Sequence, residues 1–438
     1  MLNHRRILVL GAGRSGRAAA ALARDRGAQV ILSDSNPNAA PLDGVENAMG
    51  HHPVDVLAVG DLMVVSPGIS VNAAPVQAAL AAGVEVVGEL GFAASLLPSG
   101  RTIIAITGTN GKSTVTWFTA GLLAQAGRRV FVGGNLGTPL SAAFEEDWDI
   151  AVVEVSSYQM ELPGSFQPDV AAILNLSPDH LERHGTLENY AEHKCRLVHA
   201  LPEHGLALLP SQDPLLSRLT EGHPGETAWM DSLPGVLVKE NRACLEQGEV
   251  DLSGLTAPGA LNRWNAAVAC FLAVNVGVDI QDLSVDSLTA LPHRMEPVAD
   301  SQGVLWINDS KATNVEATAR GLEGLEGPMV VLLGGQGKAG SDYGQLLGVL
   351  RDRARAVVCF GASASEIASS LSELNPCCTG GLDEAVSKAR EMVREGDSVI
   401  LSPACASFDE FVDYADRGAA FRRLANDESA QGAARRMS

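Results

Sequence analysis

The sequence lacks several features that would each point to a class of protein. No apolar run approaches the roughly 20 residues of a membrane-spanning helix, so we expect no membrane insertion. The seven cysteines include no CxxC pair, which favours reduced thiols and a cytoplasmic location. Positive charge is scarce, since 32 Lys and Arg face 52 Asp and Glu. The resulting net charge of −20 argues against nucleic acid as a partner but not against a small anionic ligand.

A single hydrophobic core cannot accommodate a chain of 438 residues, so several domains are expected. Apolar strand-like runs alternate with helical patterns along most of the chain, which is typical of doubly wound parallel sheets. We therefore predict an α/β fold of three domains, each built on a mainly parallel sheet. The predicted boundaries are residues 1–90, 91–290 and 291–438.

The stretch from Ile103 to Thr116 has the plan of a phosphate-binding loop. An apolar run leads to Gly108 and Gly111, followed by Lys112, two hydroxyl residues and a helical pattern. Backbone N–H groups and a helix N-terminus attract phosphate, while a lysine reaches the outer phosphates. The full Walker pattern is not met, because Ile106 stands where its first glycine belongs. The alternative is a plain glycine turn with a solvated lysine.

The N-terminal segment has a second glycine-rich loop, Gly11-Ala12-Gly13-Arg14-Ser15-Gly16, between a strand-like run and a helical pattern. Asp34 ends the next strand-like run, which completes a Rossmann fingerprint. The simplest interpretation is a nicotinamide-dependent oxidoreductase. A UDP-sugar also carries a diphosphate, however, so the loop indicates only a diphosphate-bearing nucleotide.

Candidate metal ligands follow two apolar strands of the middle segment. Glu154 ends one strand, where a carboxylate beside a phosphate loop suits Mg²⁺. Asp179 and His180 follow the next strand, and His180 is either a metal ligand, a catalytic group or merely structural. Lys194 lies in a helical pattern and by itself is interpreted as a solvated lysine.

Polar residues also follow three predicted strands of the last segment. These clusters are residues 308–314, 334–338 and 402–407. Ligands bind at the carboxyl ends of the strands in such sheets, so we expect a binding site there.

The order of motifs resembles the Mur ligases, the ATP-dependent amino-acid-adding enzymes of peptidoglycan synthesis. The motifs are TGTNGKST, VEVSS, Asp179-His180, Lys194, PHRME, NDSKATN and GGQGK. The stretch SPACASFDEF from Ser402, with Tyr414 and Arg417 after it, is similar to the branch of the family that adds D-glutamate. The resemblance implies a Rossmann-like N-terminal domain, a P-loop ATPase-like central domain and a Rossmann-like C-terminal domain.

The resemblance also implies the ligands and their sites. The substrates would be ATP, UDP-N-acetylmuramoyl-L-alanine and D-glutamate, joined through an acyl phosphate by a chain that we expect to be monomeric. ATP would contact Gly108, Thr109, Asn110, Gly111, Lys112, Ser113, Thr114, Asn265, Arg294 and Asp309. The UDP-sugar would contact Ser15, Asp34, Ser66, Asn135 and His180. D-Glutamate would contact Lys311, Thr313, Lys338, Ser407 and Tyr414.

In the family, two Mg²⁺ ions lie at the reaction centre. One would be held near Ser113 and Glu154, and the other by His180 and Lys194. A lysine ammonium repels Mg²⁺, but in these enzymes the lysine carries CO₂ as a carbamate, which offers oxygen ligands instead. Lys112, Glu154, His180 and Lys194 are therefore the expected catalytic residues.

Some features depart from the family pattern, and alternatives remain open. Leu261 stands where the family usually has a histidine, which puts nearby adenine or metal contacts in doubt. One alternative is another carboxylate–amine ligase, such as a different Mur ligase or a folylpolyglutamate synthase, although the N-terminal Rossmann pattern disfavours the folate enzyme. The other alternative is the oxidoreductase suggested by the GAGRSG loop.

Overall fold

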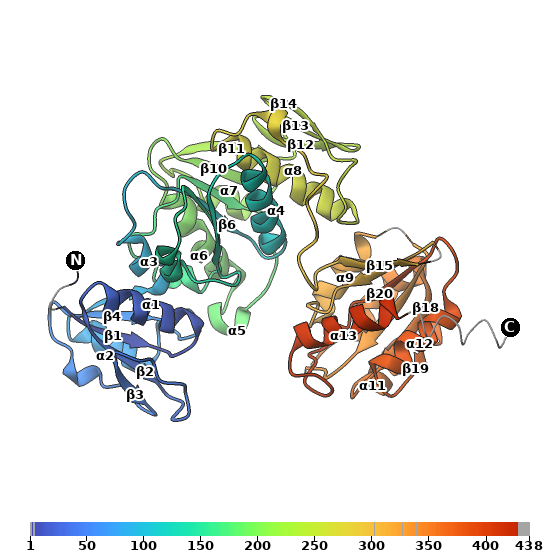
Figure 1. Cartoon of the computed structure of the whole chain (residues 1–438), viewed down its shortest axis with the longest axis horizontal. Helices are drawn as coiled ribbons and strands as arrows, with labels where there is room; N and C mark the ends of the chain where they lie inside the picture. The colour runs from blue at the N-terminus through green and yellow to red at the C-terminus, as the bar shows by residue number, and fades with distance from the viewer. Residues whose placement is uncertain (1, 3–4, 302, 326, 339, 428–438) are drawn as a thin grey trace. The chain divides into compact units, whose positions relative to one another are not determined.

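The computed structural model describes residues 2, 5–301, 303–325, 327–338 and 340–427 (Figure 1). The chain forms two compact units, one of residues 1–253 with 265–285 and the other of residues 254–264 with those from 286 onward. Three mainly parallel sheets, one for each predicted segment, confirm the α/β class. The domain boundaries near residues 90 and 290 stay predictions.

The N-terminal sheet of the first unit has five parallel strands in the order β3-β2-β1-β4-β5. The strands are β1 (Arg6–Leu10), β2 (Gln29–Asp34), β3 (Glu46–Met49), β4 (Leu62–Val65) and β5 (Glu85–Gly88), with helices α1 (Arg14–Asp25) and α2 (Ala74–Ala81) between them. The strand order reverses between β1 and β4. A ligand crevice is expected at the carboxyl ends of these two strands.

The second sheet of the first unit has nine strands in the order β14-β13-β12-β11-β10-β9-β6-β8-β7. Its parallel part comprises β6 (Thr102–Thr107), β7 (Val130–Gly134), β8 (Ile150–Glu154), β9 (Val170–Ile173), β10 (Leu206–Pro210), β11 (Glu226–Met230) and β12 (Gly235–Lys239). The antiparallel strands β13 (Arg242–Leu245) and β14 (Gly248–Asp251) extend it at one edge. The central strand β6 is buried between β8 and β9 and leads directly into the phosphate loop.

Helices and short turns connect these strands. They are α3 (Glu89–Ala94), α4 (Lys112–Gln125), η3 (Gln159–Glu161), α5 (Leu181–His184), α6 (Leu187–His199) and α7 (Pro214–Leu219), and α8 (Ala260–Val274) follows the last strand. One apolar core joins α6 to the strands on one side of the sheet, and its members include Ala105, Val153, Ala191 and Cys195. This packing fixes α6 beside the carboxyl end of β6.

The sheet of the second unit has six strands in the order β15-β16-β20-β17-β18-β19. They are β15 (Glu296–Ser301), β16 (Val304–Asn308), β17 (Met329–Gly334), β18 (Ala354–Phe360), β19 (Cys377–Cys378) and β20 (Ser398–Leu401). Only β15 runs antiparallel to its neighbour among the described strands. Helices α9 (Val315–Glu323), α10 (Leu347–Arg353), α11 (Ala364–Ser370), α12 (Leu382–Met392) and α13 (Tyr414–Asn426) complete the unit. Two apolar cores cover the two faces of the sheet, as in other doubly wound sheets.

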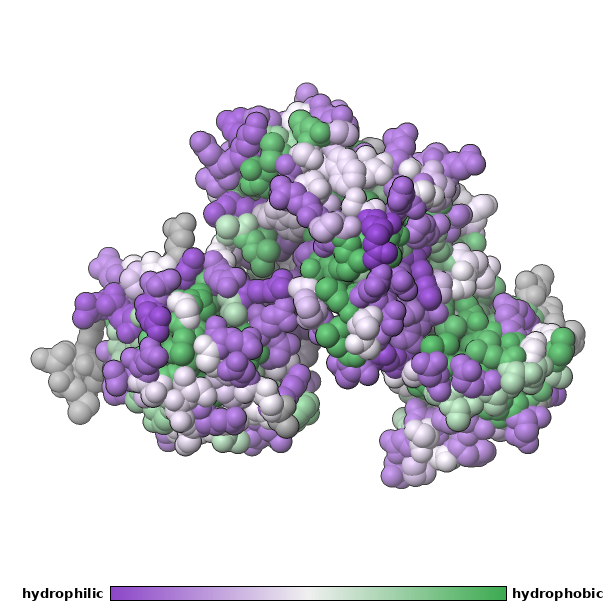
Figure 2. Space-filling model, turned by 180° about the vertical axis from the view of Figure 1, so that it is seen from behind, coloured by the Kyte–Doolittle hydropathy of each residue, from purple (hydrophilic) through white to green (hydrophobic). Residues whose placement is uncertain are grey.

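The surface is largely polar on the face that Figure 2 shows. Hydrophilic side chains cover much of the face seen in Figure 2, and hydrophobic patches lie between them. Within the part of the chain that the structure describes, no helix has the length and apolarity needed to cross a bilayer.

Candidate active site

The phosphate loop lies between β6 and α4, as the sequence predicts. Gly108 and Gly111 adopt φ angles of +148° and +84°, which residues with a side chain rarely adopt. A Cβ on Gly108 would also lie 3.0 Å from the Leu174 Cβ. Both glycines are therefore required by the backbone, and α4 begins directly after them with Lys112.

Two lysines converge on this loop. Lys112 Nζ donates to the carbonyl oxygens of Gly108 and Thr109, each at 2.8 Å. Lys194, from α6, donates its Nζ to the same Gly108 oxygen at 2.8 Å. The Lys194 side chain is buried, with 1% of the residue exposed, and its Nζ lies 4.3 Å from the centroid of the Tyr190 ring. The solvated lysine suggested by the local sequence is therefore wrong.

Burial changes the acid–base behaviour of Lys194. Desolvation, followed by the nearby charge of Lys112, lowers the pKa of the Lys194 ammonium well below its usual value. A larger fraction of this amine is consequently neutral at physiological pH than for an exposed lysine. A neutral amine is a nucleophile, whereas an ammonium group is not.

Side chains after β9 hold the outer part of the loop. The Asn175 amide accepts from the Asn110 N–H at 2.9 Å and donates to the Asn110 carbonyl at 3.0 Å. The Thr109 hydroxyl donates to the Ser177 carbonyl at 3.1 Å and accepts from its N–H at 3.0 Å. Sequence reasoning assigned no role to Asn175, although its place directly after a strand was a usable signal.

Glu154 lies at the end of β8, opposite Ile106 of β6 in the strand register. The residue is only 2% exposed. Its Oε1 accepts from Asn135 Nδ2 at 2.5 Å, while its buried Oε2 has no hydrogen-bond partner among the described residues. Buried polar atoms normally have partners, so an unsatisfied carboxylate oxygen suits a divalent cation. Ser113, in the first turn of α4, is also buried.

His180 lies at the start of α5 in a left-handed conformation, with φ of +54°. Its half-exposed ring packs against Tyr158, with 5.0 Å between the ring centroids, and its Nε2 lies 3.5 Å from Asp179 Oδ2. Among the described residues, no three His, Cys, Asp or Glu side chains gather closely enough to hold a metal by themselves. A metal at this position would therefore need other ligands, such as a modified lysine, a hydroxyl, water or phosphate.

A cavity of about 540 Å³ gathers four of the predicted UDP-sugar residues, Ser15, Asp34, Ser66 and Asn135. Loops at the carboxyl end of the N-terminal sheet form part of its wall, and residues 134–139 after β7 form another part. Arg14 Nη1 donates to the Gly137 carbonyl at 2.8 Å and so connects these two parts. The fifth predicted residue, His180, does not line this cavity.

Asp34 holds the turn of the GAGRSG loop. Its carboxylate accepts from the Ala12 N–H at 2.7 Å and from the Asn36 N–H at 2.9 Å. The Asn36 and Ala12 hydrogen bonds lower the pKa of the Asp34 carboxyl. A Cβ on Gly16 would lie 1.8 Å from the Gly11 carbonyl oxygen, so the last glycine of the motif is required for packing.

Apart from Asn265, the remaining predicted residues belong to the second unit. Asp309 follows β16 and is buried, and burial raises the pKa of its carboxyl to about 7. Its side chain accepts from Ser402 Oγ at 2.7 Å and from the Met295 N–H at 3.2 Å. Arg294 Nε is buried and has no partner among the described residues. Asn265, in the first unit, likewise has a buried Oδ1 without a hydrogen-bond partner among the described residues. This oxygen lies 3.0 Å from the position that a Cβ on Gly111 would take, so it is next to the phosphate loop.

Four of the residues predicted to bind the amino acid follow the carboxyl ends of the adjacent strands β16, β20 and β17, and the fifth, Tyr414, begins α13. Lys311 Nζ lies 5.4 Å from the centroid of the Tyr414 ring. Ser407 is buried and Lys338 is exposed, each just after the antiparallel bridge between Gln336 and Ala406. Thr313 is half-buried just before α9.

A buried arginine supports the loops that carry these residues. Arg417 donates to Ser310 Oγ at 2.9 Å and to the carbonyls of Ser310, Cys405 and Ala406 at 2.9, 3.0 and 3.2 Å. It thereby ties the loops after β16 and β20 to α13. Sequence reasoning noted Arg417 within a motif but gave it no role, because a sequence does not show which arginines are buried.

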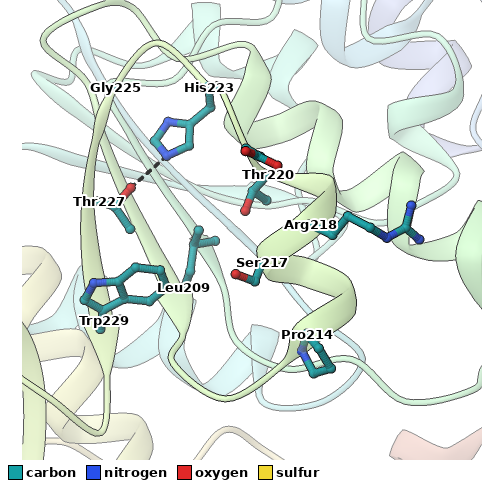
Figure 3. A pocket seen from close by; sticks show the side chains of 11 residues that line it. Leu209, Pro214, Ser217, Arg218, Thr220, His223, Gly225, Thr227 and Trp229 are labelled. Atoms are coloured by element: carbon teal, nitrogen blue, oxygen red, sulfur yellow. Dashed lines mark hydrogen bonds between the residues drawn. The ribbon is translucent and has the colours of Figure 1, made fainter.

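A larger cavity lies elsewhere in the first unit, beside α7. Its volume is about 710 Å³, and Trp229, Thr227 and Ser217 are among the residues around it (Figure 3). His223 Nε2 lies 2.8 Å from Thr227 Oγ1 at its edge. None of the predicted site residues lines this cavity.

Three family models match successive parts of the chain. They are "Mur ligase MurD-like, N-terminal domain" over residues 5–88, "Mur ligase middle domain" over 106–228 and "Mur ligase, glutamate ligase domain" over 293–405. The UDP-N-acetylmuramoylalanine–D-glutamate ligase of Koribacter versatilis is 36% identical, over 96% of this chain and 97% of the relative.

Two solved structures share the fold. UDP-N-acetylmuramate–alanine ligase MurC of Thermotoga maritima is 18% identical with a TM-score of 0.58, covering 98% of this chain and 100% of its own. MurF ligase of Thermotoga maritima, solved in complex with ADP, is 19% identical with a TM-score of 0.57, covering 88% of this chain and 97% of its own. At these identities the likeness bears on the fold alone.

Proposed function

This chain belongs to the Mur ligase family, and we propose that it joins D-glutamate to UDP-N-acetylmuramoyl-L-alanine while converting ATP to ADP and phosphate. The observation that carries the proposal is the relative named for this reaction, which is 36% identical over almost the whole of both chains. The phosphate loop and the cavity of the first unit, together with the lysines that follow strands of the second unit, suit three substrates.

The reaction needs activation because a carboxylate is a poor acyl donor. In the first step the L-alanyl carboxylate oxygen bonds to the γ-phosphorus, and the bond to ADP breaks. In the second step the amine of D-glutamate attacks the acyl carbon, the bond to phosphate breaks, and the amine releases a proton. Phosphoryl transfer depends mainly on positioning and charge neutralisation, which the protein can supply.

The positive charge that neutralises the β- and γ-phosphates would come from Lys112 and the N-terminus of α4. Lys112 now donates to two backbone carbonyls of the loop, so its ammonium is held within the loop itself. Asn175 and Ser177 keep the loop in shape through Asn110 and Thr109. The rest of ATP would be bound by Asn265, Arg294 and Asp309, because each has a buried polar atom. Asn265 Oδ1 and Arg294 Nε have no hydrogen-bond partner in the described structure.

The donor set fits Mg²⁺, which would neutralise phosphate charge when bound. Glu154, through its unpartnered Oε2, and Ser113 would hold one ion. His180 and a carbamylated Lys194 would hold the second. The low pKa and burial of Lys194 support this modification, because only the neutral amine adds CO₂, and loss of its proton then leaves carbamate oxygens.

The other two substrates would bind to residues of different units. Ser15, Asp34, Ser66 and Asn135 line the proposed UDP-sugar cavity. Lys311, Thr313, Lys338, Ser407 and Tyr414 would bind D-glutamate, whose two carboxylates favour the two lysines. We further propose that the chain acts as a cytoplasmic monomer.

Product analysis tests this function. The chain is incubated with ATP, Mg²⁺, UDP-N-acetylmuramoyl-L-alanine and D-glutamate, and the UDP-sugar is weighed by mass spectrometry. We expect a product heavier by one glutamyl residue, formed only when all components are present. An unchanged UDP-sugar, or phosphate release that is equal without D-glutamate, would contradict the proposal.

A further inference from the structure

Arg183 connects two parts of the first unit that the proposed function assigns to different tasks. It lies in α5, three residues after His180. Its guanidinium donates to both carboxylate oxygens of Glu161, at 2.7 and 2.8 Å. It also donates to the carbonyls of Ile69 at 2.9 Å and Gly68 at 3.4 Å, in the loop after β4.

The pair of Arg183 and Glu161 is well shielded from solvent. Their side chains are 16% and 6% exposed, so their mutual attraction is weakly screened by water. Glu161 also accepts from the Val71 N–H at 3.3 Å, which adds a second contact to the same loop. Gly68 and Ile69 line the proposed UDP-sugar cavity, so the pair buttresses one wall of that cavity.

Arg183 is also connected to His180, through a backbone hydrogen bond and through the ring of Tyr158. The Arg183 N–H donates to the His180 carbonyl at 3.0 Å. The guanidinium lies 4.9 Å from the centroid of the Tyr158 ring, and the same ring packs against His180 at 5.0 Å. Tyr158 therefore contacts both the arginine and the histidine.

Local structure alone cannot fix His180. The helix that follows it, α5, has only four residues, and such a short helix is unstable in isolation. His180 itself has a φ of +54°, which is unfavourable for a residue with a side chain. Tertiary contacts must therefore hold this segment, and Arg183 donates two hydrogen bonds from it to the loop after β4.

We propose that Arg183 is a positioning residue that couples the wall of the UDP-sugar cavity to His180. This inference rests on the proposed function, because it assumes that the cavity takes the UDP-sugar and that His180 acts at the reaction centre. A UDP-sugar held against Gly68 and Ile69 steadies Arg183, and Arg183 in turn steadies α5 and His180. Affinity for the UDP-sugar and turnover then depend on the same side chain.

The test is Arg183→Lys, which keeps the charge beside Glu161 but lacks the fork needed to reach the two loop carbonyls as well. We expect the Kd for UDP-N-acetylmuramoyl-L-alanine to rise about tenfold and the kcat of ADP formation to fall about tenfold. Each tenfold change corresponds to a free energy of about 1.4 kcal/mol. The Kd for ATP, measured alone, should stay within about twofold, since the hydrogen bonds of the Arg183 side chain in the described structure go to Glu161, Gly68 and Ile69 and not to the phosphate loop. Hydrogen exchange of residues 66–71 should become faster.

Arg196→Lys is the matched control. Arg196, on α6, donates to the Met160 and Glu161 carbonyls at 2.8 and 3.1 Å, so it anchors the same segment as Glu161. No hydrogen bond in the described part of the chain joins it to residues 66–71. The control should therefore change none of the four readouts, even if it lowers the melting temperature.

A second variant keeps the inference testable if Arg183→Lys does not fold. Glu161→Gln preserves the size of the side chain and removes one charge. The Kd for the UDP-sugar should rise and the kcat should fall, each by about threefold, which corresponds to under 1 kcal/mol.

The outcomes separate the two claims. A wild-type chain that does not bind the UDP-sugar contradicts the proposed function together with the coupling. A wild-type chain that binds it, with a folded Arg183→Lys variant that has normal Kd, kcat and exchange, contradicts the coupling alone. A variant with a lower melting temperature but unchanged Kd and kcat also contradicts it, because that result indicates a purely structural role.

Discussion

The first unit contains two glycine-rich loops of the same plan, and they are held by side chains of opposite charge. Each loop follows a buried parallel strand and leads into a helix. In the GAGRSG loop, the Asp34 carboxylate accepts from the Ala12 N–H. In the phosphate loop, the ammonium group of Lys112 and the buried amino group of Lys194 donate to the Gly108 carbonyl.

The difference shows that glycine spacing sets the shape of such a loop, whereas the surrounding charges select its ligand. A carboxylate at the GAGRSG turn already uses one of the N–H groups that would bind phosphate. Lys112 at the other loop adds positive charge, as a triphosphate requires. We therefore expect changes at one loop to affect ATP and changes at the other to affect the UDP-sugar.

Removing Lys112 should have the largest effect. Lys112→Ala eliminates the charge at the outer phosphates, so ADP formation should fall by roughly a thousandfold or more. Binding of the UDP-sugar, measured by calorimetry, should be unchanged, because that cavity has no contact with Lys112 in the described structure. A variant with ADP formation within tenfold of the wild-type rate would refute the assignment of this loop.

Lys194 should be nearly as important. Lys194→Ala removes the proposed carbamate, and turnover should fall by roughly a hundredfold. Wild-type activity should decline in buffer stripped of CO₂ and recover when bicarbonate is added, whereas the variant should respond to neither change. The carbamate proposal fails if Lys194→Ala retains near-normal turnover.

The GAGRSG loop should show the opposite selectivity. Asp34→Ala releases the Ala12 and Asn36 N–H groups, which should loosen the cavity wall and weaken UDP-sugar binding by about tenfold. The Kd for ATP, measured in the same calorimeter, should not change. Equal losses of affinity for ATP and for the UDP-sugar would contradict the assignment of a different ligand to each loop.

The smallest expected effect concerns pH and stability. The pKa of Asp34 is lowered from 3.8 in the folded chain, so its carboxylate stabilises the fold above pH 3.8. That contribution is lost as the pH falls through the folded-state pKa. The urea concentration at the midpoint of unfolding should fall less with decreasing pH for Asp34→Asn than for the wild type. The same pH dependence of this midpoint in both proteins would count against this role of Asp34.

The sequence predicted the two loops well because their requirements are local. Apolar strands, glycines at positions with positive φ and a following helix all leave direct traces in the order of residues. The fold class followed from the alternation of strands and helices. The antiparallel strands β13 and β14 were not predicted, because short polar runs at a sheet edge carry little pattern.

Residues whose role depends on tertiary packing were harder to predict. Lys194 lies four residues after the buried Tyr190, so the two share one face of α6, and this spacing was the available signal of its burial. Arg183 gave no such signal, since its partners Glu161 and Ile69 are distant in sequence. Coupling between loops that a fold brings together cannot be read from local patterns.

The amino-acid dependence of ADP formation tests the central claim most directly. With ATP, Mg²⁺ and UDP-N-acetylmuramoyl-L-alanine present, D-glutamate, L-glutamate, D-alanine and L-lysine are added in turn. We expect D-glutamate alone to support steady ADP formation together with a heavier UDP-sugar. Equal rates with every amino acid, or a preference for one other than D-glutamate, would contradict the account.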